Sequence, residues 1–337
     1  MRLIEPLGLV SDVATIPHGL ALPLRGGPIG FTLARLIDGL QDRVVPVAAI
    51  PADWDEVVTN VVQHPAPWAG LILEDPVVMG ILNVTPDSFS DGGRLVDPAV
   101  AIDAGIAMAR AGAAILDVGG ESTRPGAAPV APEEEQARVL PVIRALAGLG
   151  LRVSVDTRNA ATMDLALDAG AIIVNDVSGL TYDNRAASVV SRRGAPVVLM
   201  HMRGDPATMN DLAYYDDVAV EVTIELAALV AAACSRGVAA NQIVIDPGIG
   251  FAKTMRHNLE LLKRTTLLFN LGCPILVGVS RKSFIGKISA IDQAQRRISG
   301  SISAGLHAAA HGVSILRVHD VAETIQAIEI QKAIRGC

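Results

Sequence analysis

The sequence has few cysteines, few aromatic residues and no basic runs. Its three cysteines, Cys234, Cys273 and Cys337, are scattered without paired spacing, which favours a reduced, cytoplasmic setting over a disulfide framework. Aromatic residues make up 3% of the chain and the formal net charge is -7. This combination argues against nucleic acid as a partner, because proteins that bind it carry basic patches and stacking aromatic side chains.

Segments that would indicate a membrane, a signal peptide or a common cofactor loop are also missing. Half of the residues are hydrophobic, yet even the longest apolar helix pattern, 215–237, carries charges, so we expect no membrane-spanning segment of ~20 residues. The start, MRLIEPLG, lacks the basic and apolar regions of a signal peptide. No Cys or His cluster has zinc-ligand spacing, and no glycine-rich P-loop is present.

What the sequence does contain is a series of nearly continuous aliphatic stretches, at 77–84, 113–120, 152–157, 171–177, 195–201, 242–248, 274–280 and 314–321. Strands that are buried on both faces of a parallel sheet have this composition. Helix patterns alternate with them, for example at 97–112, 132–150 and 215–237. Eight strand-then-helix units over residues 77–337 predict an α/β fold, a (β/α)8 TIM barrel of about 260 residues.

Polar and charged residues follow each predicted strand. In a TIM barrel the loops after the strands build the active site. Taken singly, Asp156 or Asn175 indicates a helix cap or a turn. However, Lys282, Arg317 and His319 occupy the same strand-end positions and cannot cap a helix N-terminus as Asp does. The collective pattern therefore predicts a site at one mouth of the barrel.

Several segments resemble dihydropteroate synthases: MGILNVTPDSFSDGG (79–93), GGESTRPGA (119–127), GIGFAKT (248–254), GVSRKSF (278–284) and RVHDV (317–321). The resemblance runs from about Val77 to the C-terminus. It implies a transferase of folate biosynthesis, a target of sulfonamides, that joins 7,8-dihydropterin-6-ylmethyl diphosphate to p-aminobenzoate and releases pyrophosphate. It also implies a homodimer formed through the later barrel helices.

The pterin presents an amino group beside a ring N–H, and this edge suits a carboxylate in a two-point hydrogen bond. Asp156 and Asp246 are placed for that contact, and Asn175 can donate and accept at neighbouring ring atoms. The resemblance implies that the pterin site comprises Asp156, Asn175, Met200, Asp246, Phe251, Lys282 and Arg317, with Met200 and Phe251 lining the slot and Arg317 stacking on the ring. Alone, Met200 and Phe251 would be interpreted as core residues.

The diphosphate needs cationic or metal partners. We expect Arg124, Arg317 and His319 to bind it, and Asn83 to offer an oxygen to a Mg²⁺ that otherwise binds phosphate oxygens and water. Without Arg317 and the rest of RVHDV, His319 would be interpreted as a structural histidine. The resemblance implies a p-aminobenzoate site made of Phe89, Thr123, Pro125, Ser280 and the stem of Lys282.

The amine of p-aminobenzoate is already a nucleophile, so no covalent enzyme intermediate is expected. The resemblance implies that diphosphate departs before attack, with catalytic roles for Asp156, Lys282, Arg317 and Arg124. Two alternatives stay open. One is a pterin-binding methyltransferase acting on a methylated folate, a class that lacks the SRKSF and TRPG segments. The other is a non-catalytic pterin-binding homologue, which would have lost Arg124, Lys282 or His319.

Two positions depart from the family pattern, and one region lies outside it. Ala252 stands where the family commonly has glycine, and the fourth loop reads LTYDNR in place of a glycine-rich turn. Residues 1–76 form an N-terminal extension with a net charge of -5 and both tryptophans. We expect a small α+β unit, with a hairpin that turns at residues 25–28 and a short helix that ends before Pro65.

Overall fold

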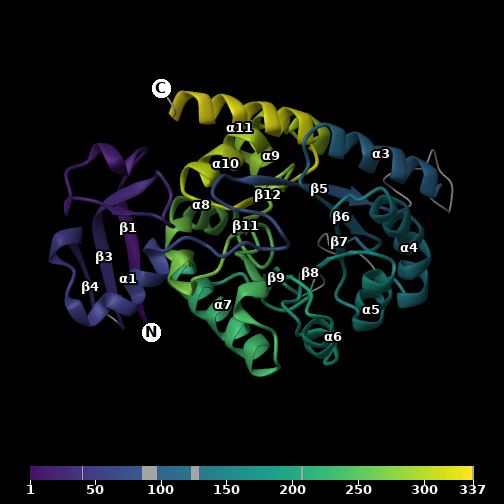
Figure 1. The fold of residues 1–337 in the computed structure, drawn as a ribbon, viewed down its shortest axis with the longest axis horizontal. Coiled ribbons are helices and arrows are strands. Elements are labelled where there is room, and N and C mark those ends of the chain that lie inside the picture. Colours follow the sequence, from purple (N-terminus) through teal and green to yellow (C-terminus); the bar gives the residue numbers. More distant parts are fainter. Residues whose placement is uncertain (40, 86–96, 123–128, 206–207, 336–337) are drawn as a thin grey trace.

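The computed structural model describes residues 1–39, 41–85, 97–122, 129–205 and 208–335. They form a small antiparallel sheet with one helix and, beside it, a parallel barrel ringed by helices (Figure 1). The small sheet and helix, at the left of Figure 1, belong to the first 76 residues, here called the N-terminal unit.

The barrel consists of eight parallel strands in the order β10-β9-β8-β7-β6-β5-β12-β11. An isolated parallel bridge between Ile245 and Ile275 joins the two ends of this order. The TIM-barrel prediction is confirmed, and each strand lies in one of the predicted aliphatic stretches. The strands are β5 (Val77–Asn83), β6 (Ile115–Gly119), β7 (Val153–Asp156), β8 (Ile173–Asp176), β9 (Val197–Met200), β10 (Ile243–Asp246), β11 (Leu276–Val277) and β12 (Ile315–Val318).

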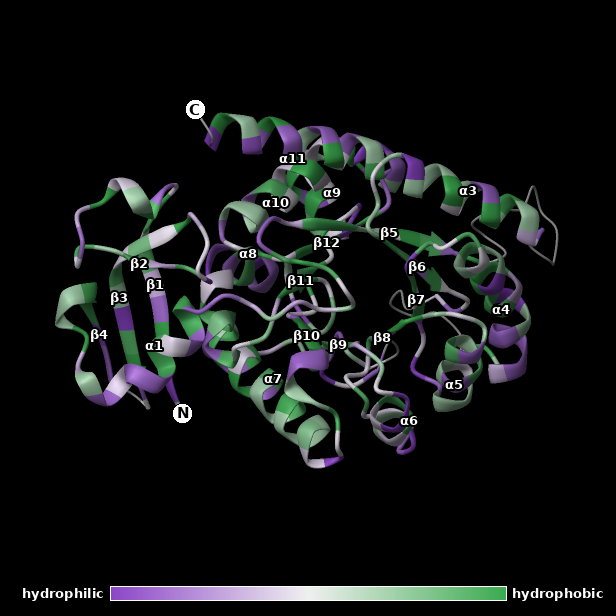
Figure 2. Ribbon diagram, viewed as in Figure 1, coloured by the Kyte–Doolittle hydropathy of each residue, from purple (hydrophilic) through white to green (hydrophobic). Residues whose placement is uncertain are grey.

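The barrel strands are mostly hydrophobic in Figure 2, because both of their faces are buried. The helices around them are striped, because each packs an apolar side inward. Asp97 and Asp217 cap α3 and α7 through backbone N–H groups, and Gly194 ends α6 in a left-handed conformation. The barrel helices are α3 (Pro98–Arg110), α4 (Pro132–Gly148), α5 (Ala160–Asp168), α6 (Ala186–Arg193), α7 (Val218–Ser235), α8 (Met255–Lys263), α9 (Ser283–Ser289), α10 (Ile298–Ala310) and α11 (Val321–Arg335).

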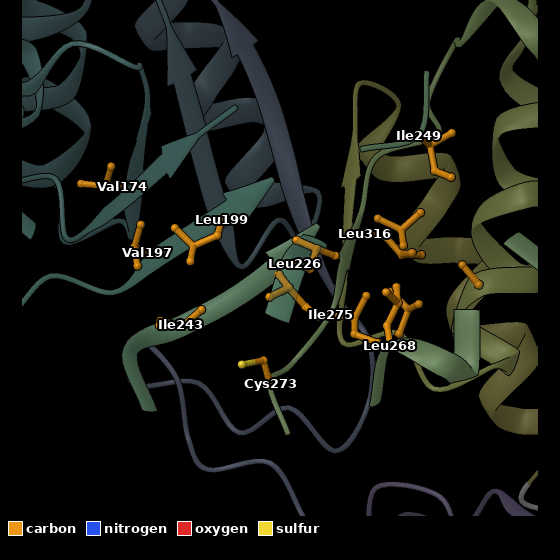
Figure 3. Close-up of a cluster of buried hydrophobic side chains, with 14 of the residues drawn as sticks. Val174, Val197, Leu199, Leu226, Ile243, Ile249, Leu268, Cys273, Ile275 and Leu316 are labelled. Atoms are coloured by element: carbon orange, nitrogen blue, oxygen red, sulfur yellow. The ribbon is translucent and has the colours of Figure 1, made fainter. Parts of the chain in front are cut away.

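Among the described residues, α7 is long and apolar enough to cross a membrane by length and composition alone. It nevertheless carries Glu221 and Glu225, both paired with Arg203, and it packs on β9. Figure 3 shows side chains of the buried layer to which these elements contribute, with Leu226 of α7 and Leu199 of β9. We therefore describe α7 as a helix of the barrel.

The inside of the barrel is closed by a residue from outside it. The indole of Trp68 is 1% exposed and packs with Met79, Ile115, Val244 and other inward side chains near the amino ends of the strands. Its Nε1 donates to the carbonyl of Gln242 at 2.7 Å. Trp68 thus lies at the end of the barrel opposite to the carboxyl ends of the strands.

The N-terminal unit has β3 (Gly30–Asp38) at its centre, with β1 (Arg2–Val10) on one edge and β2 (Leu22–Pro23) and β4 (Gln41–Pro46) on the other. The expected hairpin is the β2–β3 pair, and Arg25 adopts a positive φ in its turn. The expected helix is α1 (Asp55–Val62). A cavity of about 540 Å³ lies between β1, α10 and α11, and none of the predicted site residues that the structure describes lines it.

Candidate active site

The predicted site residues that the structure describes lie at the carboxyl ends of the barrel strands or in the loops that follow them. Asn83, Asp156, Met200 and Asp246 are each the last residue of a strand, and Asn175 is the last but one of β8. Parallel strands that close into a barrel bring their carboxyl ends to one mouth. These residues, separated by up to 163 positions in the chain, therefore share one end of the molecule.

Arg317 of β12 connects three of these strands. Its Nε donates to Oδ2 of Asp117 at 2.6 Å, and one terminal nitrogen donates to Oδ2 of Asp156 at 2.7 Å. The Nδ2 of Asn175 also donates to Oδ2 of Asp117, at 2.8 Å. The guanidinium therefore bridges the carboxylates of β6 and β7, and its planar fork suits two acceptors at once.

Asp117 is a site residue that the sequence reasoning did not assign. It lies inside the aliphatic stretch of β6, is fully buried, and accepts from both Arg317 and Asn175. A charged residue in the middle of an apolar strand is costly unless it is paired. That contrast between Asp117 and its apolar neighbours is the signal that could have identified it.

At this mouth of the barrel, two buried carboxylate oxygens have no partner among the described atoms, namely Oδ1 of Asp117 and Oδ1 of Asp156. A buried acceptor without a partner is unfavourable, and such atoms in native proteins call for an explanation. Burial raises the pKa of Asp156 above its usual value, and the charge of Arg317 opposes this shift. Asp156 is thus poised to accept hydrogen bonds from a ligand.

Lys282, Phe251 and Asp246 lie on the other side of the mouth. Lys282 Nζ is 4.3 Å from the centroid of the Phe251 ring, a cation–π distance. Burial lowers the pKa of Lys282 to about 8, with Asp246 opposing the shift. Burial also raises the pKa of Asp246, whose Oδ1 accepts from the N–H of Gly248 at 2.7 Å. Met200 is 4% exposed.

His319 and Ser280 form a pair where β11 and β12 end. The Nδ1 of His319 lies 3.0 Å from Ser280 Oγ, which also accepts from the backbone N–H of His319 at 3.1 Å. Burial, together with the charges of Arg281 and Arg317, lowers the pKa of His319 to about 3. This shift favours the uncharged imidazole, which can supply a hydrogen bond to an anion.

The loop between β10 and α8, residues 247–254, is held by its neighbours. Ala252 adopts a φ of +49° and is 1% exposed, a conformation that disfavours any residue with a Cβ atom. This explains why glycine suits the position. The hydroxyl of Tyr215 donates to the carbonyl of Ala252 at 3.1 Å, and Lys253 Nζ donates to the carbonyl of Phe251 at 2.9 Å.

Lys253 also belongs to a buried polar chain that the sequence analysis missed. Its Nζ lies 2.9 Å from Nδ1 of His201, whose Nε2 lies 2.8 Å from Glu225. Because lysine can only donate, Nδ1 accepts and Nε2–H donates to the carboxylate. Burial lowers the pKa of Lys253 to about 7 and that of His201 to about 4.

The altered fourth loop leaves Asn175 in place at β8. Asp176 accepts from the N–H groups of Ser178 and Leu180 and from the Ser178 hydroxyl. These bonds fold a tight turn in which Leu180 has a φ of +63°. Asp176 therefore has the structural role that a strand-end Asp taken alone suggests.

Within the described parts of the chain, no group of three or more His, Cys, Asp or Glu side chains could hold a metal ion. Asn83 is half-buried at the end of β5 and can offer one amide oxygen. This suits a Mg²⁺ that takes most of its ligands from phosphate and water, and it does not suit a resident ion. Phe89, Thr123, Arg124 and Pro125 lie outside the described residues.

Comparisons with known proteins show which family the chain resembles. A family model described as "Pterin binding enzyme" matches residues 79–319. A dihydropteroate synthase of Synechocystis sp. is 45% identical over 258 residues, which cover 76% of this chain and 89% of the relative.

Solved structures of dihydropteroate synthases are also similar to this chain. Xanthomonas albilineans dihydropteroate synthase with 4-aminobenzoic acid superposes with a TM-score of 0.75 at 44% identity, covering 80% of this chain and 97% of the other. The structure of the enzyme of that organism in complex with 7,8-dihydropteroate gives a TM-score of 0.72 at 41% identity, with 79% and 96% coverage.

The fold and the strand-end carboxylates thus define a barrel of the pterin-binding class. The sequence identity to dihydropteroate synthases, and the large share of each chain that is matched, identify the family within this class. The chain belongs to the dihydropteroate synthase family.

Proposed function

We propose that this chain is a dihydropteroate synthase. It transfers the pterinylmethyl group of 7,8-dihydropterin-6-ylmethyl diphosphate to the amine of p-aminobenzoate and releases pyrophosphate. The observation that carries the proposal is Asp156: a buried strand-end carboxylate, bonded through one oxygen to Arg317, whose other oxygen has no partner among the described atoms. The amino and ring N–H groups of a pterin are donors that such an oxygen can accept.

In this proposal the pterin lies between the two sides of the mouth. Asp156 and Asp246 accept from the pterin, and Asn175, fixed by Asp117, contributes its remaining amide groups. Lys282 donates to the ring, while Met200 and Phe251 line the slot. Arg317 stacks on the ring, and for this its bond to Asp156 has to lengthen or break while the Asp117 bond anchors the guanidinium.

The diphosphate is bound by Arg124, Arg317 and neutral His319, with Asn83 as the protein ligand of Mg²⁺. When bound, Mg²⁺ neutralises charge on the departing diphosphate. The carboxylates of Asp156 and Asp246 stabilise positive charge that develops on the pterin methylene, so their contribution is larger in the transition state than in the ground state. Arg124, Lys282, Arg317 and Asp156 carry the catalytic roles.

The p-aminobenzoate site is formed by Phe89, Thr123, Pro125, Ser280 and the stem of Lys282, and sulfonamides compete there. Ser280 is buried at the end of β11, next to His319. The ring of p-aminobenzoate would thus lie beside the departing diphosphate. This places its amine near the pterin methylene, and the enzyme's main task is to hold the two substrates in that geometry.

We also propose a cytoplasmic homodimer, in which residues 1–76 are an appended α+β unit and residues 77–337 form the catalytic barrel. Exposed apolar side chains on α8, α9 and α11 support an interface through the later barrel helices, namely Met255, Leu259, Ile288, Ile330 and Ile334. Light scattering of the purified protein distinguishes a dimer from a monomer.

The test of the activity is pyrophosphate release that depends on both p-aminobenzoate and the pterin diphosphate. Release without p-aminobenzoate would indicate hydrolysis, and no release with both substrates would overturn the proposal. Methyl transfer from a methylated folate, assayed in parallel, tests the alternative enzyme class.

A further inference from the structure

The N-terminal unit is attached to the barrel by a buried arginine that also pairs with the N-cap of α7. Arg264 follows the last residue of α8, and its side chain is 9% exposed. Its Nε and one terminal nitrogen donate to the two oxygens of Glu5 in β1, at 2.7 and 2.9 Å. The second terminal nitrogen donates to both oxygens of Asp217, at 2.8 Å each.

Each partner of Arg264 has a defined structural position. Glu5 is 4% exposed and lies in the strand of the N-terminal unit that faces the barrel. Asp217 is the N-cap of α7 and accepts from the N–H groups of Ala219 and Val220. Charge-assisted, bidentate bonds of this kind fix geometry as well as adding energy. Arg264 therefore joins the N-terminal unit to the start of α7.

The start of α7 is in turn joined to the pterin-slot loop, residues 247–254. Tyr215, two residues before Asp217, donates to the carbonyl of Ala252 at 3.1 Å. The Arg203 guanidinium stacks 3.9 Å from the Tyr215 ring centroid and pairs with Glu221. Glu221 accepts from the backbone N–H of Asp217 at 3.0 Å. The position of Tyr215 is thus tied to that of Asp217.

The slot loop needs such support because of Ala252. A left-handed conformation is unfavourable for a residue with a Cβ and persists only where neighbouring structure imposes it. Ala252 directly follows Phe251, the ring that lies against Lys282. Loss of support at Ala252 would let the loop relax and move Phe251.

We propose that the N-terminal unit braces the pterin slot through the path Glu5, Arg264, Asp217, Tyr215 and Ala252. Resting on the proposed function, this assigns residues 1–76 a positioning role in pterin binding. The unit contributes no group to the reaction. It lowers the freedom of the slot loop, so its loss weakens pterin binding more than it slows turnover at saturating substrate.

The experiment is a double-mutant cycle read out as the Kd of a plain pterin by calorimetry. Glu5→Gln keeps the shape of the side chain and removes its charge, and Asp217→Asn keeps an equally good helix cap. Each single variant should bind the pterin about threefold to tenfold more weakly, which lies within the range for residues along a coupling network. The Kd of the double variant should be no higher than that of the single variant with the higher Kd, because the two substitutions act through the same residue, Arg264.

Arg2→Gln is the matched control. Arg2 lies in the same strand and pairs with Asp38 and Asp53 on the exposed side of the unit, so its loss should change the Kd less than twofold. Tyr215→Phe, which removes only the hydroxyl bonded to Ala252, should reproduce the effect of Asp217→Asn. Thermal unfolding of each variant establishes that binding is measured on folded protein.

A second readout does not depend on the reaction. Amide hydrogen exchange over residues 247–254 should be faster in Glu5→Gln than in the wild type, and exchange in α4 should be unchanged. Wild-type Kd values and unchanged exchange in Glu5→Gln would overturn the brace. Independent, multiplicative effects of the two substitutions would overturn the path through Arg264. A wild-type protein that binds no pterin would instead overturn the proposed function, and exchange would still decide whether the brace exists.

Discussion

Asp156→Asn separates a ligand-binding carboxylate from a structural one. The substitution keeps the shape of the side chain but removes its charge and places an N–H where one oxygen accepted. A hydrogen bond to a charged group is worth about 1.5–3 kcal/mol, which corresponds to roughly 10-fold to 150-fold in affinity. We therefore expect the Kd of a plain pterin to rise at least about tenfold, and kcat to fall further because the carboxylate also stabilises the developing cation.

Unlike pterin affinity and kcat, the free energy of unfolding should not fall in Asp156→Asn. Burial raises the pKa of Asp156 in the folded protein, so the ionised carboxylate destabilises the native state, and this cost grows as the pH rises from the usual pKa of Asp to the raised one. Asn cannot ionise, and Arg317 keeps its bond to Asp117. The free energy of unfolding of Asp156→Asn at pH 7–8 should therefore equal or exceed that of the wild type, as denaturant titration would measure.

Asp176→Asn is the matched control. Asp176 is equally buried at the neighbouring strand end, but both of its oxygens are used by the turn that ends at Leu180. Its pterin Kd should stay within about threefold of the wild-type value. Equal pterin affinity in Asp156→Asn and wild type would refute the slot assignment, and equal losses in the two variants would reduce the effect to a general disturbance of the strand ends.

Three other predictions concern the anchor, the pH and the far end of the barrel. Asp117→Asn keeps an acceptor for Arg317 and Asn175 but loses the charge, so kcat/KM should fall about tenfold while unfolding stays cooperative. Asp117→Ala should lose more activity, and wild-type activity in both variants would contradict the anchor role of Asp117. Because the pKa of Lys282 is lowered to about 8, its charged form is lost as the pH rises through that value. Pterin affinity measured by calorimetry should therefore decline between pH 7 and 9. A flat profile, or the same decline in Lys282→Met, would contradict this prediction. Trp68 closes the barrel opposite to the strand ends and Trp54 is buried in the N-terminal unit, so tryptophan fluorescence should barely change on addition of p-aminobenzoate; a large change would show that ligand closure reaches one of these sites.

Local periodicity was enough to predict the barrel. A strand that is buried on both faces needs a run of aliphatic residues, and a connecting helix needs its own spacing, so eight alternating units determine the class of fold whatever their partners. The same logic placed Asp156, Asn175, Asp246, Lys282 and Arg317 at one mouth, because all parallel strands of a barrel end on the same side. The resemblance of the strand-end motifs then indicated the family.

Only the tertiary structure revealed which of these groups are bonded to each other. Arg317 meets Asp117 across 200 positions, and Glu5 meets Arg264 across 259. No local pattern encodes such pairs, since they exist only once the barrel closes and the N-terminal unit packs against it. Trp68 and Ala252 illustrate the same limit. A tryptophan before the first strand does not indicate that it fills the barrel, and an alanine does not reveal a left-handed backbone, because both depend on surroundings that distant segments supply.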